Sequence, residues 1–133
     1  MIKERFWTSL GKYLSPVPNA QGEKINWINY KTGVKQVRFL LEADNKHALL
    51  GIWLAHKEPE KRNRLFTAIS LLKDEFISVA GRDWIWDSQF VLGDKTGAAI
   101  FTEVADVSIF KETDWPAMIT FFKMNLVNLD RFW

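Results

Sequence analysis

The chain of 133 residues contains no cysteine, and it has no long apolar run. Without cysteine it can form neither a disulfide framework nor a thiolate site. The apolar stretch at 48–55, ALLGIWLA, is far shorter than the roughly 20 residues needed to span a bilayer. The first ten residues, MIKERFWTSL, lack the apolar core of a secretory signal. We therefore expect a cytoplasmic protein without a membrane span.

What the chain does contain is typical of a globular protein. Hydrophobic residues make up 47% of the sequence and charged residues 26%, which argues against an intrinsically disordered chain. Its 10 Phe and 7 Trp supply enough apolar surface for a substantial core. Because 133 residues suit one ordinary domain, we expect a single domain over residues 1–133.

The net charge of +2 is unevenly distributed along the chain. Residues 1–64 carry 12 Lys and Arg against 6 Asp and Glu, a net charge of +6. Residues 65–133 carry 6 against 10, a net charge of −4. Such a division is typical of a nucleic-acid-binding face, and it is equally compatible with two parts that complement each other in the fold.

Helical periodicity of apolar residues predicts three helices. The first covers residues 2–14 and ends before the two prolines of Ser15-Pro16-Val17-Pro18. The second begins at Pro59 and ends at Gly81, and the third runs from Thr113 or Asp114 to the end of the chain. The residues expected on their buried faces are Ile2, Phe6, Leu10 and Tyr13, then Leu65, Ile69, Leu72 and Phe76, then Met118, Phe121, Phe122, Leu126, Leu129 and Trp133.

Five strands are predicted, at 24–30, 34–42, 47–56, 84–90 and 98–105. The turns between neighbouring strands are short, at 31–33, 43–46 and 93–97, so the strands should form antiparallel hairpins. Segment 47–56 is almost entirely apolar, which indicates a central strand. The expected fold is α+β in the order α-β-β-β-α-β-β-α, a mainly antiparallel five-stranded sheet packed with three helices.

The segment INWINYKTG at 25–33 interleaves aromatic and polar residues, as a base-stacking strand would. Strand parity, however, points Trp27 and Tyr30 to opposite sides, whereas stacking aromatics would share one open face. We therefore interpret this segment as a strand and turn that build the sheet. Ile25 and Trp27 are expected in the core with Phe39, Leu41, Leu50, Ile52 and Leu54, and Tyr30 and Lys31 stay candidates for ligand contact.

The catalytic motifs that the sequence contains do not form a site. Ser70-Leu71-Leu72-Lys73 matches the Ser-x-x-Lys pattern of serine β-lactamases, but it falls inside a predicted helix, where backbone N–H groups are not free to bind an oxyanion. The glycines at 93 and 97 link two strands and do not open a helix, so they form no phosphate cradle. The two histidines, His47 and His56, are nine residues apart on one strand and point to opposite faces. We therefore expect no catalytic residues, no metal site and no cofactor.

A restriction-type nuclease is the enzyme class that the predicted element order fits best. Its metal site needs an Asp on one strand and a Glu/Asp-x-Lys pattern on the next. Strand 47–56 contains no carboxylate, and Asp44-Asn45-Lys46 matches the pattern only within a turn. Glu42 is the only acid of the middle strands. The residues of an intact nuclease site are therefore missing.

Three stretches resemble a known family: ERFWTSL with KINWINYKTG near the start, AHKEPEKR in the middle, and EVADVSIFKETDWPAMITFFK near the end. Together they are similar to a bacterial family known only as a domain of unknown function, and the resemblance spans Glu4 to Trp133. Members of that family commonly lie C-terminal to a segment similar to restriction-type nuclease domains. The resemblance implies an accessory domain in a DNA-processing setting, and it supplies no catalytic residues. Because the sequence begins with methionine and shows no such upstream segment, we expect either a stand-alone member or a piece of a longer protein.

Three hypotheses of function follow. The first is an accessory binding domain for nucleic acid or a protein partner, whose contacts would be Tyr30, Lys31, Lys35, Arg38, His56, Lys57, Lys61, Arg62 and Arg64. The second is a small enzyme or a degenerate restriction-type nuclease, with a site near the end of strand 47–56 that combines His56 and Lys57 with an acid such as Glu42. The third is a self-associating structural domain, a homo-oligomer, because seven tryptophans are hard to bury fully in 133 residues.

Overall fold

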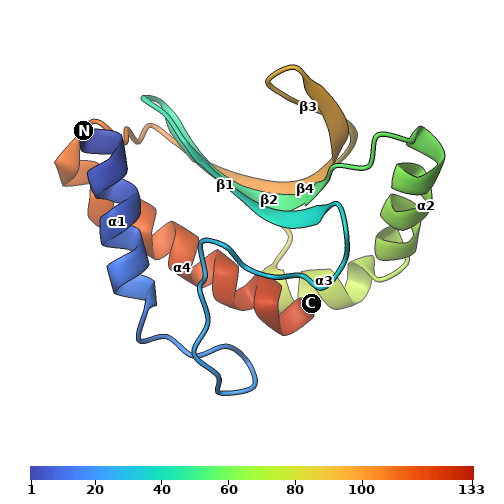
Figure 1. Ribbon diagram of the computed structural model, residues 1–133, viewed down its shortest axis with the longest axis horizontal. Coiled ribbons are helices and arrows are strands. Elements are labelled where there is room, and N and C mark those ends of the chain that lie inside the picture. The colour runs from blue at the N-terminus through green and yellow to red at the C-terminus, as the bar shows by residue number, and fades with distance from the viewer.

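The computed structural model describes residues 1–133 as four α-helices and one four-stranded antiparallel sheet (Figure 1). In chain order the elements are α1 (Ile2–Leu14), β1 (Val37–Ala43), β2 (His47–Leu54), α2 (Pro59–Ser70), α3 (Lys73–Ala80), β3 (Ile85–Leu92), β4 (Lys95–Ala105), a short 3-10 helix (Glu112–Asp114) and α4 (Trp115–Phe132). None of the helices combines the length and the apolar character that crossing a bilayer requires.

The sheet consists of two antiparallel hairpins, joined so that the strand order is β1-β2-β4-β3. The seam between the hairpins is the antiparallel pair of β2 with β4, in register from His47 opposite Ala105 to Leu54 opposite Ala98. Two of the three predicted hairpins and the central position of β2 are therefore confirmed. All residues of β2 after His47 are buried, as its apolar sequence indicated.

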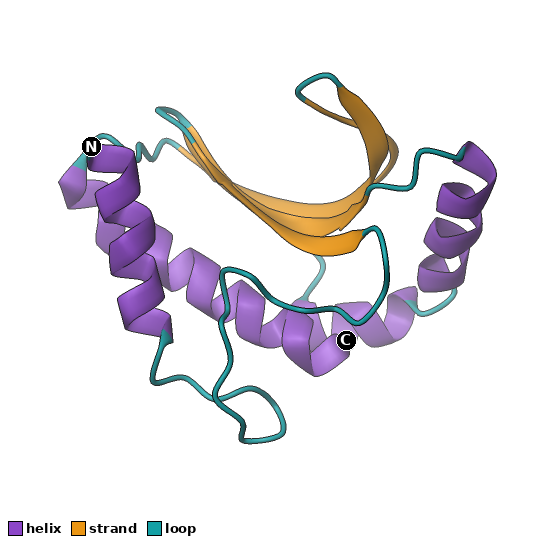
Figure 2. Ribbon diagram, viewed as in Figure 1, coloured by secondary structure: helices purple, strands orange, loops and turns teal.

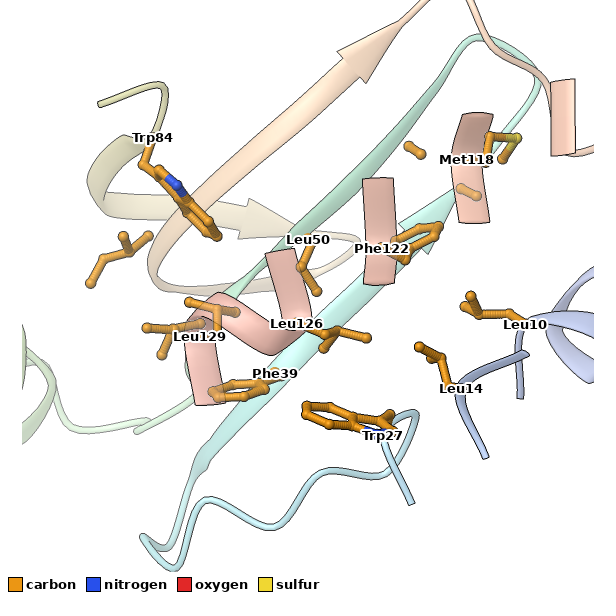
Figure 3. Packing of buried hydrophobic residues seen from close by; sticks show 14 of the residues in the cluster. Leu10, Leu14, Trp27, Phe39, Leu50, Trp84, Met118, Phe122, Leu126 and Leu129 are labelled. Carbon is orange, nitrogen blue, oxygen red and sulfur yellow. The ribbon is translucent and has the colours of Figure 1, made fainter. Parts of the chain in front are cut away.

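A layer of helices covers one face of the sheet (Figures 1 and 2). Figure 3 shows how α4 packs its apolar face on the sheet and on α1, with Trp27 from the loop closing the side of the core. The buried residues of α4 are Met118, Ile119, Phe122, Leu126 and Leu129, and those of α1 are Phe6, Leu10 and Leu14. This spacing of three and four residues is the helical period seen in the sequence.

The other face of the sheet, here called the open face, has no helix over it. It carries a separate apolar cluster of Leu40, Leu49, Trp53, Ala99 and Phe101, all from strands. These residues are buried because the β3–β4 hairpin curls over them, as Figure 1 shows. The curl follows from a β-bulge, since the four residues Asp87 to Phe90 of β3 lie opposite only three residues of β4, Ala99 to Gly97. The bulge brings the Phe90 ring against those of Trp53 and Phe101, at centroid distances of 5.8 and 5.0 Å.

The prediction of five strands and three helices is wrong, because the sheet has four strands and segment 24–30 is not one of them. Its single strand-like contact is an isolated bridge between Pro18 and Lys24. The side chain of Asn26 accepts a hydrogen bond from the backbone N–H of Asn29 at 3.3 Å, which favours a turn over a ladder. Trp27 is nevertheless buried, and its indole N–H donates to the Val17 carbonyl at 2.8 Å.

The predicted helix from Pro59 to Gly81 is two helices, α2 and α3, so the element order is α-β-β-α-α-β-β-α. The break falls at Leu71 and Leu72, which are 81% and 48% exposed and do not continue the buried stripe. No Gly or Pro marks it in the sequence. The hydroxyl of Ser70 donates to the Phe66 carbonyl at 2.7 Å, a local bond of the kind that bends helices.

The expected core is mostly confirmed. Trp27, Phe39, Leu50, Ile52 and Leu54 are buried, whereas Ile25 and Leu41 are half-buried against the same core. Tyr13, placed in the stripe of the first helix, is exposed, and the buried position beside it is Leu14. The second Lys-Thr-Gly triplet, 95–97, was expected in a turn, yet it opens β4, and the turn itself is the shorter Gly93-Asp94.

Candidate anion-binding site

Positively charged side chains gather where β2 ends, β4 begins and α2 starts. The antiparallel register of the seam brings these two strand ends together, because Leu54 lies opposite Ala98. Between them and α2 lies a cavity of about 450 Å³, here called the basic pocket. Its lining includes three cations, two polar side chains and one aromatic ring: Lys57, Arg62, Lys95, Gln36, Thr96 and Trp53. No carboxylate lines it.

Arg62 is the unusual residue of the basic pocket, because it is charged and only 5% exposed. Its Nη1 donates to the carbonyl oxygens of His56 and Thr96, at 3.1 and 3.4 Å. Its Nε is buried and has no hydrogen-bond partner, and no acid lies within ion-pair distance of the guanidinium. A guanidinium cannot lose its proton at physiological pH, so the charge stays and lacks a counter-ion.

The apolar wall of the basic pocket is rigid. The Trp53 side chain is 2% exposed, and its ring lies directly over Gly97. A Cβ atom at Gly97 would lie 2.5 Å from the ring and 2.5 Å from the Leu54 carbonyl oxygen, so only glycine fits there. Phe90 packs edge-on against the same ring from the curled hairpin. The wall is therefore in place before any ligand arrives.

The first turn of α2 is the second positive feature. Its backbone N–H groups at Glu60 and Lys61 make no hydrogen bond within the chain, and the Glu58 side chain does not cap them. Glu58 instead pairs with Lys61 at 3.4 Å, on the outside of the helix. A second cavity of about 270 Å³ adjoins this turn and shares Gln36 and Lys57 with the basic pocket. His56 lines it and has a buried Nδ1 without a partner.

The opposite end of the open face is acidic. Glu42 and Glu103 flank Leu49 in one row across β1, β2 and β4. His47 lies beside them, with Nδ1 2.9 Å from Asp44 Oδ1 and Nε2 3.7 Å from Glu103 Oε2. The backbone N–H of Lys46 donates to Asp44, which lowers the pKa of that carboxyl, and the N–H and ring of His47 act in the same direction. No group of three or more His, Asp and Glu side chains is arranged to hold a metal ion.

Four of the predicted contact residues come together at the basic end: His56, Lys57, Lys61 and Arg62. A fifth, Arg38, is exposed on the open face in the same row as Trp53, to which it is paired across β1 and β2. These five residues surround the end of β2 and the start of α2.

The other four predicted contacts lie elsewhere or are used internally. Lys31 and Lys35 are exposed in the loop before β1. Arg64 follows Arg62 by two residues, about 200° around α2, so it faces away from the pocket. The Tyr30 hydroxyl donates to Asp130 Oδ1 at 2.6 Å, and its ring stacks on Phe39 with a centroid distance of 4.2 Å. Tyr30 is therefore part of the loop packing.

The residues named for an enzyme are not assembled. Glu42 lies opposite Leu49, whereas His56 and Lys57 follow Leu54, so about 17 Å of strand separates the acid from the histidine. Asp44-Asn45-Lys46 forms the tight turn between β1 and β2, where the Asp44 carboxylate is occupied by local hydrogen bonds. Glu42, His56 and Lys57 therefore share no site.

A larger cavity, of about 600 Å³, lies elsewhere, between the end of α1 and loop residues 24–29. Lys24 is the only ionisable residue of its lining, so it offers no acid–base pair. A further cavity, between Tyr13 and Met124, is lined by apolar and polar side chains of α4, and Lys123 is its only charged residue. Neither cavity concentrates charge as the basic pocket does.

Sequence reasoning missed Gln36, Trp53, Lys95 and Thr96. The signal for Lys95 was present, because pairing the predicted strands 47–56 and 98–105 antiparallel places the end of one beside the start of the other. Gln36 gave no signal, since its place in the pocket depends on a left-handed backbone, φ +66°, just before β1. Trp53 gave no separate signal within its apolar strand, and its ring belongs to the cluster on the open face.

The fold and site define an α+β domain with a basic pocket at one end of an open sheet face. The chain belongs to the family described as domain of unknown function DUF4268, whose model matches residues 2–133. The resemblance inferred from the sequence to a family of unknown function is thus confirmed. No curated protein and no solved structure shows significant similarity to the chain.

Proposed function

We propose that this domain is an accessory nucleic-acid-binding module that contacts phosphate groups through the basic end of its open face. The observation that carries the proposal is the buried Arg62 guanidinium, which has no acidic partner and is surrounded by further cations. A buried charge without a counter-ion is costly, and a phosphate group would provide the missing negative charge.

The surroundings of Arg62 support a phosphate ligand over a neutral one. Lys57 and Lys95 reach the same cavity from the end of β2 and the start of β4. The uncapped first turn of α2 adds the positive end of a helix dipole. The sequence resemblance implies that family members lie next to nuclease-like segments. Such a neighbour would bring the basic pocket close to DNA.

The proposed binding does not involve base stacking. The rings of Trp53 and Phe101 are 2% and 8% exposed, so they offer no free face to a base. Binding should therefore depend on the backbone, vary little with sequence and weaken steeply with salt.

The test is fluorescence anisotropy with labelled single- and double-stranded DNA at about 50 mM and about 200 mM salt. The triple variant Lys57→Ala, Lys61→Ala, Lys95→Ala should weaken binding at least about tenfold and lower the salt slope by about 2. The matched control changes three exposed lysines of α1 and α4, Lys3, Lys12 and Lys123, to Ala and removes the same charge. Absence of binding at low salt, or equal losses in both triple variants, would refute the proposal.

A further inference from the structure

The basic pocket has the features of a binding site for one phosphate group, which differ from those of an open groove that follows the nucleic-acid backbone. In a groove that binds the nucleic-acid backbone, exposed Lys and Arg side chains are spaced along the groove, and each contacts one phosphodiester. Here Lys57, Arg62 and Lys95 converge on one cavity from the β2–α2 loop, from α2 and from the start of β4. Arg62 is 5% exposed, so only a group that enters the cavity can reach its guanidinium.

We propose that the basic pocket binds the terminal phosphomonoester of a nucleic-acid strand, so that the domain recognises strand ends. This inference rests on the proposed function and deepens it. A phosphomonoester carries a charge of about −1.5 to −2 at neutral pH, whereas each phosphodiester of the backbone carries about −1. Three cations without a lining carboxylate suit the dianion.

The donors also suit a monoester. A terminal phosphate offers three acceptor oxygens, and a diester within the strand offers two. The pocket presents the Lys57 and Lys95 ammonium groups, the Thr96 hydroxyl and the Gln36 amide beside Arg62. The unpartnered N–H groups of the first turn of α2 lie at the same end of the sheet.

The size of the cavity indicates what accompanies the phosphate. About 450 Å³ is within the range of small-molecule sites and far exceeds one phosphate group, so the terminal sugar can enter with it. Ala55 and Pro59, which line the cavity and are not buried, supply apolar surface for that sugar. The acidic end of the open face, with Glu42 and Glu103, would repel a strand that continued across the sheet. A strand that ends in the pocket avoids this repulsion.

The experiment compares three single strands of one sequence by anisotropy, with a 5′-phosphate, with a 3′-phosphate, or with hydroxyls at both ends. The label is attached at the end opposite the phosphate, and the unphosphorylated strand is labelled at each end in turn. We expect one phosphorylated strand to bind about tenfold more tightly than the unphosphorylated one. Lys95→Ala should remove this preference, and the control Lys12→Ala should keep it. Both lysines are exposed, so neither change disturbs the core.

A second experiment measures the thermal unfolding temperature with inorganic phosphate or with a nucleoside 5′-monophosphate. Chloride at equal ionic strength is the control. This experiment distinguishes the strand-end inference from the proposed function. Equal binding of all strands would overturn the strand-end inference and leave nucleic-acid binding standing. No strand binding, with stabilisation by inorganic phosphate that Lys95→Ala removes, would refute both the proposed function and the strand-end inference and assign the basic pocket to a free phosphate ligand. Binding of the mononucleotide as tight as that of the strand would overturn recognition of strand ends. No response in either arm would overturn both.

Discussion

Tyr30, a predicted ligand contact, instead forms hydrogen bonds and packing contacts within the fold. Burial, the hydrogen bond to Asp130 and the negative charge of Asp130 raise its pKa well above the ordinary value of 10.0. The raised pKa favours the protonated phenol in the folded state. Folding should therefore lose stability above about pH 10, where tyrosine ionises in the unfolded chain but not at Tyr30 in the folded one.

This pH dependence can be measured directly, because the chain has only two tyrosines. In Tyr13→Phe, Tyr30 is the only tyrosine, and its tyrosinate absorbance should appear only far above pH 10. Denaturant unfolding of the same variant should show stability that falls as the pH rises above about 10. Tyr30→Phe is the control and should lack that fall. A tyrosinate titration centred near pH 10 in folded Tyr13→Phe would contradict the internal hydrogen bond.

Gly97 and Gly11 form a matched pair for testing the wall of the basic pocket. Gly97→Ala should destabilise the fold by about 1–3 kcal/mol, because its Cβ meets backbone and a packed ring at 2.5 Å. Gly11→Ala should be neutral or stabilise by up to about 1 kcal/mol, because Gly11 lies in α1, where its new Cβ meets only Ile28 Cδ1 at 3.4 Å. Chemical denaturation measures both, and equal effects would contradict the close contact of Gly97 with Trp53.

Single residues of the site were predictable where charge alone marked them. Lys57, Lys61 and Arg62 stood out as a basic helix start, but nothing in the sequence distinguished the buried Arg62 from the outward Arg64. That distinction depends on how α2 rotates against the end of the sheet, which is a tertiary property. Tyr30 was misleading because strand parity was applied to a segment that forms a turn.

At the scale of elements, the long connection between α1 and β1 is held by side chains in place of a strand ladder. Asp130 of α4 is its main anchor, since Oδ2 accepts from the backbone N–H of Ala20 and Oδ1 from the Tyr30 hydroxyl, both at 2.6 Å. The indole of Trp133 donates to the Thr32 carbonyl at 2.7 Å. The connection is therefore ordered although it contains no strand.

Asp130→Ala should destabilise the fold by about 1–3 kcal/mol, because it leaves two donors of the connection without their acceptor. Asp83→Ala, at an exposed position without side-chain hydrogen bonds or ion pairs, is the control and should change stability by less than about 0.5 kcal/mol. In Asp130→Ala, the backbone amides of residues 17–33 should exchange their hydrogens faster than in the unchanged protein. Unchanged protection there would refute the anchoring role.

The elements themselves were largely predictable because their apolar periods are clear. The hairpins, α1 and α4 follow directly from sequence spacing. The lost fifth strand and the split of the second helix could not be foreseen, because both depend on side-chain hydrogen bonds from Asn26 and Ser70 to nearby backbone. Such local bonds leave the apolar pattern unchanged.

At the scale of the whole molecule, burial of the tryptophans weakens the case for self-association, which stays a prediction. Three of the seven are buried and none falls among the exposed residues, so the argument from unburied indoles loses its basis. The charge is instead the most uneven surface property, with a basic and an acidic end on one sheet face.

This arrangement predicts that removing acids from the open face strengthens nucleic-acid binding. The double variant Glu42→Gln, Glu103→Gln should bind DNA several-fold more tightly at low salt, and added salt should reduce the gain. The control Glu23→Gln, Asp83→Gln removes the same charge from exposed positions off the sheet. Anisotropy titrations measure both, and an equal gain in the two variants would show that DNA does not approach the open face.

The seam between β2 and β4 also determines how the chain must fold. Each hairpin closes over a short turn, whereas the seam pairs residues that lie 44 to 58 positions apart. Closing so long a loop slows folding, and the step joins the basic half of the chain to the acidic half. Attraction between the halves should speed this encounter, so the refolding rate measured by stopped flow should fall as salt is added. The uneven charge of the sequence would then guide the two hairpins together.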